Sequence, residues 1–398
     1  MFFENQNEEL RNYYINMLKM MGSLSNLFSS SDKPYLDSRV TENLFCMCLE
    51  AENLARTDCT ADARKGSIGI GIKTWVSSGG MQKIAEFNKV KKEYTGLKGE
   101  ELANKISEFR NERISFTMRT YDIKEMVYHC TIRDKAKITI NESPLDYIDT
   151  SNLRILTEKD HTMTFTDGIN EYGFNSSKSV LMKRFNNMNL LESIQVKILD
   201  NPYQILKKAL INNTYDSDAG LINSIEPKTI EYNDKMNKKM YPYIYLRLYS
   251  YNKQTYEKYV PEKSGLNQWN ASGRPRNPNE IYIPISPEDH RKAPNFFPKK
   301  DKSFNLKLPN GKLILAKVCQ QNSKALMSNP NKELGEWLLR DVLNLREKEL
   351  LTYQKFEILG IDSVKVYKID EENYFIDFAE IGAYEKFMEN YRNEVENV

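Results

Sequence analysis

The stretch VPEKSGLNQWNASGRPRNPNEIYIPI occupies residues 260–285, and FNLKLPNGKLILAKV follows it at residues 304–318. The second stretch alternates apolar and polar side chains on both sides of Asn310-Gly311, a dipeptide typical of a hairpin turn. Similar short segments, YIYLRLYS before these stretches and SVKVYKI and YFIDF after them, continue the strand pattern. Helices are expected only near residues 332–343 and 347–359. Residues 241–398 are therefore predicted to form a mainly β domain.

Residues 1–200 show a different order of elements. Apolar spacing predicts helices over residues 8–28 and from Ser38 onward, an Ile- and Gly-rich strand at 67–75, and a further helix over 82–94. This order favours an α/β domain. Alternating segments between residues 113 and 198 predict an added antiparallel sheet, with a turn at Asp167-Gly168. Residues 201–240 are polar and predict a linker between the two domains.

The composition is that of a folded protein with a locally basic region. The 398 residues are 40% hydrophobic, which is enough to bury ordinary domain cores, and no apolar run approaches the roughly 18 residues that cross a bilayer. The acidic N-terminus and the five cysteines without a CxxC pair favour a reduced cytoplasm. Residues 261–341 hold 14 Lys and Arg against 8 Asp and Glu. This excess fits a polyanion-binding face, although an uneven solvated surface would have the same composition.

Several catalytic classes are excluded by their missing motifs. There is no GxxxxGK[ST] loop, no GxGxxG after a strand and no methyltransferase motif, and three histidines are too few for most histidine-driven nucleases. The remaining candidates are Asp62 before the strand at 67–75, Lys73 on that strand, and Glu86 after it. Carboxylates can hold Mg²⁺, and a lysine beside the metal can orient a water. The same residues could also be an exposed acid and base in a highly charged chain.

This spacing resembles that of PD-(D/E)xK nucleases, in which an aspartate ends one strand and (Asp/Glu)-x-Lys lies on the next. The acid expected two residues before Lys73 is Gly71. In a subset of these enzymes the second acid comes from the helix after the lysine strand, and Glu86 fits that position. Glu42 corresponds to an accessory glutamate on an earlier helix. The resemblance implies a PD-(D/E)xK-like α/β domain, with Asp62 and Glu86 holding Mg²⁺.

The C-terminal stretches resemble closely the DNA-binding region of NgoFVII-type restriction endonucleases, over about residues 245–387. That resemblance implies a B3-like pseudobarrel whose two arms grip the major groove. Arg suits guanine, Asn and Gln suit adenine, and Lys and Ser suit phosphates. The Asn and Pro residues of the arms would also suit turns. The first arm, residues 264–279, offers Gln268, Asn270, Arg274, Arg276 and Asn277, and the second, residues 321–332, offers Asn322, Lys324, Ser328, Asn329 and Lys332.

Together these features predict a Type II restriction endonuclease that hydrolyses double-stranded DNA with Mg²⁺ at a short recognition sequence. One site per chain implies a homodimer, and host protection implies a separate methyltransferase. The alternative is a DNA-binding regulator or specificity subunit with an inactive N-terminal domain. The missing acid at Gly71 is the sequence feature that supports this alternative.

Overall fold

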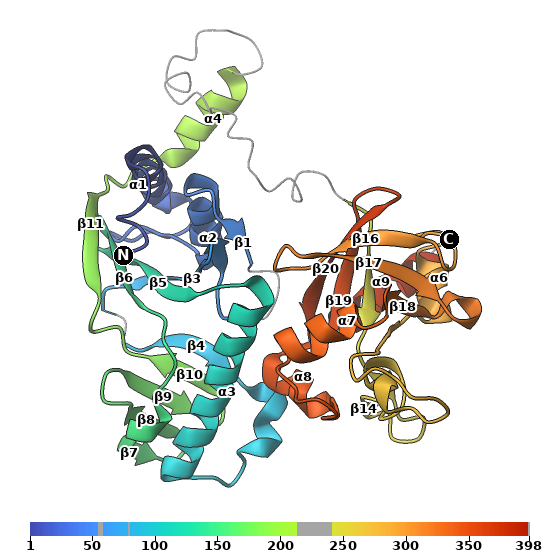
Figure 1. The fold of residues 1–398 in the computed structure, drawn as a ribbon. Coiled ribbons are helices and arrows are strands. Elements are labelled where there is room, and N and C mark those ends of the chain that lie inside the picture. Colours follow the sequence, from blue (N-terminus) through green and yellow to red (C-terminus); the bar gives the residue numbers. More distant parts are fainter. Residues whose placement is uncertain (55–58, 79, 213–240, 397–398) are drawn as a thin grey trace.

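The computed structural model describes residues 1–54, 59–78, 80–212 and 241–396 (Figure 1). Its first layer is a six-stranded sheet in the order β1-β2-β3-β5-β6-β11. Strands β3 and β5 are parallel, and the long helix α3 (Gly99–Tyr121) lies between them in the chain. The strands are β1 (Glu52–Asn53), β2 (Ala63–Lys65), β3 (Ile68–Val76), β5 (Glu125–Asp134), β6 (Lys137–Pro144) and β11 (Asn189–Gln195).

Helices cover both faces of this sheet. Helices α1 (Glu8–Ser23) and α2 (Ser38–Cys48) pack through Tyr14, Leu18 and Phe45 against the face that carries Ile70 and Ile72. The opposite face, with Trp75 and Tyr128, packs against the C-terminal half of α3. Two single turns, η1 (Ser25–Leu27) and η3 (Thr150–Asn152), lie in the connections. Along β3, Ile70 and Ile72 face α1 and α2, whereas the intervening Gly71 faces Tyr128 and Leu145 on the α3 side.

A second, antiparallel sheet lies beside the first in the order β4-β10-β9-β8-β7. Phe87, Phe109 and Phe174 form the core between this sheet, the N-terminal half of α3 and the short helix η2 (Asn88–Glu93). The helix α4 (Pro202–Asn212) follows the first sheet. The strands are β4 (Gln82–Glu86), β7 (Arg154–Lys159), β8 (Thr162–Thr166), β9 (Glu171–Asn175) and β10 (Val180–Lys183).

The C-terminal region forms a nearly closed barrel from a seven-stranded sheet in the order β12-β19-β20-β16-β17-β18-β15. Its interior is filled by large apolar side chains such as Trp337, Phe304 and Phe378. The strands are β12 (Tyr243–Arg247), β15 (Ile283–Pro284), β16 (Ser303–Lys307), β17 (Leu313–Cys319), β18 (Ala325–Ser328), β19 (Ile361–Lys368) and β20 (Asn373–Glu380), with the pair β13 (Ser250–Tyr251) and β14 (Lys258–Tyr259) outside it.

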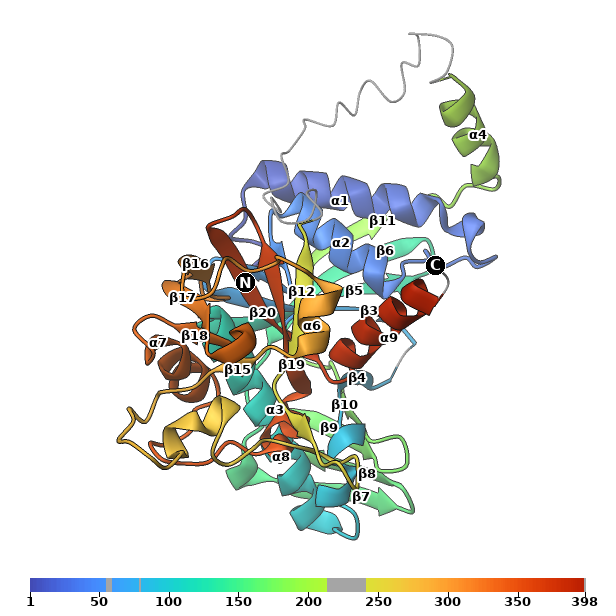
Figure 2. The ribbon, with the colours of Figure 1, turned by 90° about the vertical axis from the view of Figure 1, so that its right-hand side faces the viewer.

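Short helices surround the barrel (Figure 2). They are η4 (Gly265–Asn270), α6 (Pro287–Lys292), η5 (Gln321–Ser323), α7 (Glu333–Gly335), η6 (Glu336–Val342), α8 (Tyr353–Leu359) and α9 (Ala383–Glu396). Helix α6 begins with a capping box in which the Ser286 and Asp289 side chains each bond the other's backbone.

Helix α3 joins the two halves of the molecule (Figures 1 and 2). Its Phe116 belongs to the core of the barrel and lies 5.4 Å, centroid to centroid, from Phe378. Arg119 Nε donates to the carbonyl of Val342 at 2.8 Å, and Glu112 pairs with Lys355 at 2.9 Å. Because these contacts reach η6 and α8, the barrel is fixed against the N-terminal half by a buried surface as well as by the chain.

Three sequence expectations are wrong. The helix expected at 82–94 is β4 followed by η2, because Gln82–Glu86 pairs with β10, a strand nearly 100 residues away. The first of the alternating segments, residues 113–121, lies in α3, which is buried on several sides and so loses a simple helical stripe. The chain closes with α9 rather than with the strand β20.

Other expectations are confirmed. Hairpins turn at Asp167-Gly168 and at Asn310-Gly311, where Gly168 and Gly311 adopt φ of 89° and 87°. The opening helix, the helix from Ser38 and the Ile-Gly strand are α1, α2 and β3. The linker expected at 201–240 contains α4, and its residues 213–240 lie outside the described residues. Within the described ranges, no helix combines the length and apolar character that crossing a bilayer requires.

Candidate active site and candidate nucleic-acid interface

The structure brings Asp62 and Lys73 together at the β2–β3 hairpin. Lys73 Nζ lies 3.5 Å from Asp62 Oδ2, and the same oxygen accepts a hydrogen bond from the backbone N–H of Ile72 at 2.7 Å. The backbone of Asp62 donates to the carbonyl of Ile70, which continues the ladder of the hairpin. Both side chains keep some exposure, 20% for Asp62 and 27% for Lys73. The acid and the lysine are therefore adjacent, oriented and open to solvent.

Glu42 of α2 is the second carboxylate near this pair. Burial raises the pKa of Glu42, and the negative charge of Asp62 raises it further, while Arg39 and Lys73 act in the opposite direction. Arg39 also pairs with Glu42 at 3.5 Å. The effect of Asp62 on Glu42 places the two carboxylates within electrostatic reach of each other, where a bound cation would be favoured.

Glu86 does not lie with these residues. It sits on β4, in the five-stranded sheet, and not on a helix. Its carboxylate accepts hydrogen bonds from Lys83 and Asn88, and these contacts lower its pKa. The expected position of Glu86 rested on a helix over 82–94, and that helix is not formed.

The surroundings of Gly71 explain why the acid of the (Asp/Glu)-x-Lys motif is missing two residues before Lys73. A Cβ built at Gly71 would lie 3.0 Å from Leu145 Cδ1 and 3.1 Å from Tyr128 Cδ1. A carboxylate at this position would be forced into the apolar core under α3, where an unpaired charge is costly. The second acid of any metal site at Lys73 must therefore come from another element, and α2 supplies Glu42.

The carboxylates near Lys73 could provide only part of the ligand set of a Mg²⁺ ion. The described ranges contain no group of three or more His, Cys, Asp or Glu side chains arranged to hold a metal. Mg²⁺, however, commonly binds one or two carboxylates and fills its remaining positions with water and phosphate oxygens. A metal at this place would be held by Asp62 and Glu42, with water and phosphate oxygens in its remaining positions.

Two buried basic residues lie together beside Tyr128, and their grouping was not predicted from the sequence. Lys183 of β10 lies 5.2 Å from the ring centroid of Tyr128, and burial lowers its pKa. Arg110 of α3 donates to the Tyr128 hydroxyl at 2.9 Å and to Thr60 Oγ1 at 3.3 Å. No local pattern could have revealed this group, because it is assembled from separate strands and a helix.

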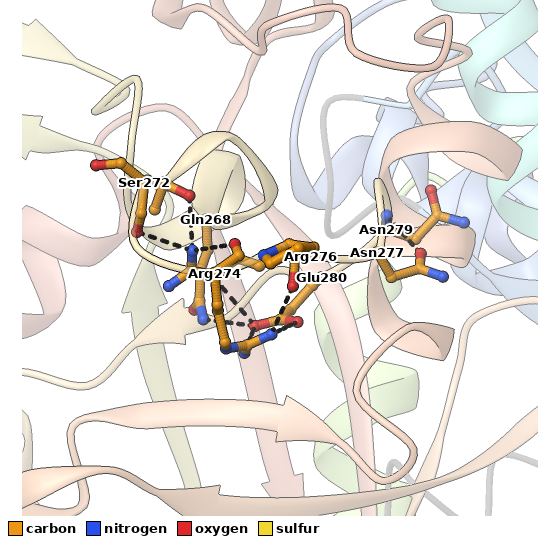
Figure 3. Close-up of polar contacts among 9 residues, drawn as sticks. Gln268, Ser272, Arg274, Arg276, Asn277, Asn279 and Glu280 are labelled. Atoms are coloured by element: carbon orange, nitrogen blue, oxygen red, sulfur yellow. Dashed lines mark hydrogen bonds and ion pairs between the residues drawn. The ribbon is translucent and has the colours of Figure 1, made fainter.

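The first arm is organised around Glu280, which is 3% exposed (Figure 3). Arg274 Nη2 donates to Glu280 Oε1 at 2.5 Å, and Gln268 Nε2 donates to the same oxygen at 3.0 Å. Arg274 nevertheless remains 55% exposed. Arg274 Nη1 also donates to Glu280 Oε2 at 3.2 Å, so the buried carboxylate binds both terminal nitrogens of the guanidinium while much of the side chain stays accessible from solvent. Glu280 was not predicted as a site residue, because the sequence shows it only as an acid between a basic loop and a strand.

Arg276 has a different place in the arm (Figure 3). Its Nη1 donates to the carbonyls of Ala271, Ser272 and Arg274 at 2.6, 3.1 and 3.3 Å, and its Nε lies 3.6 Å from Glu280. Only 15% of the side chain is exposed. Arg276 therefore closes the loop from within, whereas Arg274 presents a cation on its surface.

Asn270 and Asn277 of the first arm are exposed but serve its turns. Asn270 Nδ2 donates to the carbonyl of Glu262 at 3.0 Å, and Asn277 Oδ1 accepts from the N–H of Asn279 at 2.9 Å. Asn279 in turn accepts from Arg340 Nε of η6 at 2.8 Å. The base of the first arm is therefore fixed to the helix that follows the second arm.

The second arm has a mixed character. Asn322, Lys324, Asn329 and Lys332 are exposed, and Asn322 adopts a left-handed φ of 57°. Asn329 Nδ2 donates to Ser303 Oγ at 3.1 Å. Ser328 is buried, and its Oγ accepts from the N–H of Leu334 at 2.9 Å, so this hydroxyl caps α7 instead of facing a phosphate.

The comparison with known families concerns the barrel. Residues 244–370 match the family model described as the NgoFVII C-terminal B3-like DNA-binding domain. The match covers β12 to β19 and contains both arms, but less than half of the chain. No curated protein matches the chain. The nearly closed barrel is consistent with a B3-like domain.

Proposed function

We propose that this chain binds double-stranded DNA in a sequence-specific manner through its C-terminal barrel. The observation that carries the proposal is the family match across both arms, together with the exposed Arg274, Asn277, Asn329 and Lys332 on a shared rigid base. Arg and Asn are the side chains that read guanine and adenine edges in the major groove, and Lys suits the phosphates that fix the register.

We further propose that the N-terminal region cuts the DNA, so that the chain is a Type II restriction endonuclease of the PD-(D/E)xK kind. The adjacent Asp62 and Lys73 support this proposal, with Glu42 as the second carboxylate. Asp62 and Glu42 would hold Mg²⁺, which when bound supplies an activated water and neutralises phosphate charge. The N–H of Ile72 orients Asp62, and Lys73 would place its positive charge beside the scissile phosphate.

Three consequences belong to the same proposal. A single cleavage site per chain requires two copies to cut both strands, so the working form would be a homodimer. The chain carries no methyltransferase motif, so a separate methyltransferase would protect the host DNA. A restriction enzyme would act in the cytoplasm, where it meets incoming DNA.

The test is direct incubation of the purified chain with plasmid and phage DNA. We expect discrete fragments in Mg²⁺ and none in EDTA, with end mapping placing every cut at or near one recurring sequence. Smearing without a recurring sequence would contradict specific recognition. Binding to a recurring sequence without any cut, in Mg²⁺ or Mn²⁺, would contradict the nuclease proposal alone.

The second candidate is a DNA-binding regulator or specificity subunit without nuclease activity. Two observations favour it: Gly71 packs where the motif requires an acid, and Glu86 lies in a different sheet from Asp62. The same experiment separates the two, because both proteins would bind the selected sequence and only the nuclease would cut it.

A further inference from the structure

The outer face of β17 carries two leucines that the fold does not cover. Leu313 is 59% exposed and Leu315 is 47% exposed, while their neighbours Ile314 and Ala316 point into the barrel and are buried. On the adjacent strand β16, Lys307 lies opposite Leu313 and Asn305 lies opposite Leu315. Apolar side chains at these outward positions contribute nothing to the core of the barrel.

This face adjoins the second arm. The N–H of Asn329 donates to the carbonyl of Leu315 at 2.8 Å, which extends the β17–β18 ladder by one pair beyond Ala316 and Ser328. Residues opposite each other in an antiparallel ladder point to the same side. Asn305, Leu315 and Asn329 therefore form one outward row, with two amides flanking an apolar side chain.

One end of this face approaches the helix that holds the first arm. Lys312, at the tip of the β16–β17 hairpin, acts electrostatically on Asp341 of η6, the helix whose Arg340 holds the base of the first arm. In Figure 2, β16, β17, β18 and α7 lie along the left side of the barrel, above the gold loop that contains η4. Exposed Lys302, Lys307 and Lys312 give this side a positive charge that suits a polyanion.

We propose that Leu313 and Leu315 contact thymine methyl groups in the major groove, and that Leu315 and Asn329 together read one A·T pair. The inference rests on the DNA binding proposed above and goes beyond its two arms. The C5 methyl of thymine is the apolar group that base pairs present in the major groove, and the adenine N6 and N7 lie beside it on the same groove edge. A leucine next to an asparagine amide matches that pattern, and the flanking lysines match the phosphates.

The test removes the methyl groups one at a time. The full chain is first used to select its preferred duplex from a random pool, and each thymine of that duplex is then replaced by deoxyuridine. Losing one buried methyl contact should weaken binding about fourfold. We expect this loss at one or two thymines, and no change at the others.

Variants assign the effect to the leucines. Leu313→Ala and Leu315→Ala should bind the thymine and deoxyuridine duplexes equally at one position each, with an unchanged salt dependence. Leu156→Ala is the matched control, because Leu156 is a 50% exposed strand leucine on β7, and it should keep the wild-type ratio. Thermal unfolding of each variant checks that the barrel is intact.

The possible failures are distinguishable. A selected site without any A·T pair, or a wild-type chain that binds every deoxyuridine duplex as tightly as the thymine duplex, would overturn the leucine assignment. So would variants that retain the wild-type preference for thymine. A chain that enriches no sequence at all would instead overturn the proposed DNA recognition from which the inference starts.

Discussion

At the scale of single residues, Asp62 and Lys73 carry the proposed chemistry. Replacing Asp62 with Asn or Lys73 with Met should lower the cleavage rate about 100-fold or more, because charge stabilisation at the phosphate is lost. Glu42→Gln should also reduce the cleavage rate, because it weakens the binding of the metal. Selective DNA binding should persist in all three variants. The measurement is single-turnover cleavage beside band-shift titration.

Glu100→Gln is the control for these substitutions, because Glu100 is an exposed glutamate in the first turn of α3. Full cutting by the Asp62 and Lys73 variants would show that the chemistry lies elsewhere. Glu86→Gln decides which glutamate serves as the second acid: a loss of cutting comparable to that of Asp62→Asn would assign the role to Glu86 and not to Glu42.

Arg274 is the more exposed of the two first-arm arginines, with 55% of its side chain accessible against 15% for Arg276. Arg274→Ala should lower the affinity for the selected duplex by about 1–3 kcal/mol if it pairs with guanine, and a change in that base pair should then cost the variant little. A phosphate contact would instead weaken all duplexes alike. Arg154→Ala is the control, because Arg154 is an exposed arginine of β7. If Arg274→Ala bound DNA as tightly as the wild type, Arg274 would not be part of the DNA-recognition surface.

At the scale of elements, the first arm contacts α7, the helix after the second arm, at Gly335. A Cβ at this position would lie 1.9 Å from the backbone oxygen of Asn279, which is closer than any contact allows. Gly335→Ala must therefore displace the base of the first arm, at a cost of about 1–3 kcal/mol in the free energy of unfolding. Chemical denaturation measures this loss.

The same variant should also lose selective DNA binding, because the first arm would shift relative to the second. Gly80→Ala is the matched control: a Cβ there meets nothing within 4 Å, and its φ is not left-handed. Unchanged stability and affinity in Gly335→Ala would show that the arms are positioned independently of this contact.

Local elements with their own signals were predictable from the sequence. The hairpins at Asp167-Gly168 and Asn310-Gly311 carry turn residues, and α2 carries an apolar stripe, so each was located correctly. Elements whose form depends on distant partners were not. The apolar spacing of Gln82–Glu86 predicts a helix, but these residues form a strand because they pair with β10. The pattern of residues 113–121 predicts a strand, because α3 is buried on more than one side and lacks a single apolar stripe.

The candidate sites follow the same division. Ten residues separate Asp62 from Lys73 in the chain, and a two-strand hairpin brings them together, so their spacing and its resemblance to a nuclease motif pointed to the pair. Glu280 and Gly335 could not be found that way. Their importance arises from burial beneath one arm and from a backbone contact with it, and neither leaves a pattern in the sequence.

At the scale of the whole molecule, we expect the barrel to bind DNA sequence-specifically when it is isolated from the rest of the chain. A fragment of residues 241–398 should fold and bind the selected duplex with a steep salt dependence, because phosphate contacts release counterions. It should not cut, since Asp62 and Lys73 are absent. Band shifts at two salt concentrations provide the measurement. A folded fragment that binds neither the selected nor a scrambled duplex would refute the assignment of DNA binding to the barrel.

The fragment should also be less stable than the barrel within the full chain, because it loses Phe116 from its core. Phe116→Ala in the full chain should reproduce part of this loss, at about 3–5 kcal/mol for a buried phenylalanine. Chemical denaturation followed by tryptophan fluorescence compares the two. Equal stability of fragment and full chain would show that α3 adds nothing to the barrel.

Helix α3 has a final consequence for the geometry of any reaction on DNA. It packs Ile114 and Tyr121 under the sheet that holds Lys73, and it places Phe116 in the barrel that carries the arms. If the chain cuts DNA as proposed, this shared helix would keep the number of base pairs between the bound sequence and the reacting phosphate constant. Exchanging the barrel for that of another protein would preserve this distance only if the surface that receives α3 were exchanged with it.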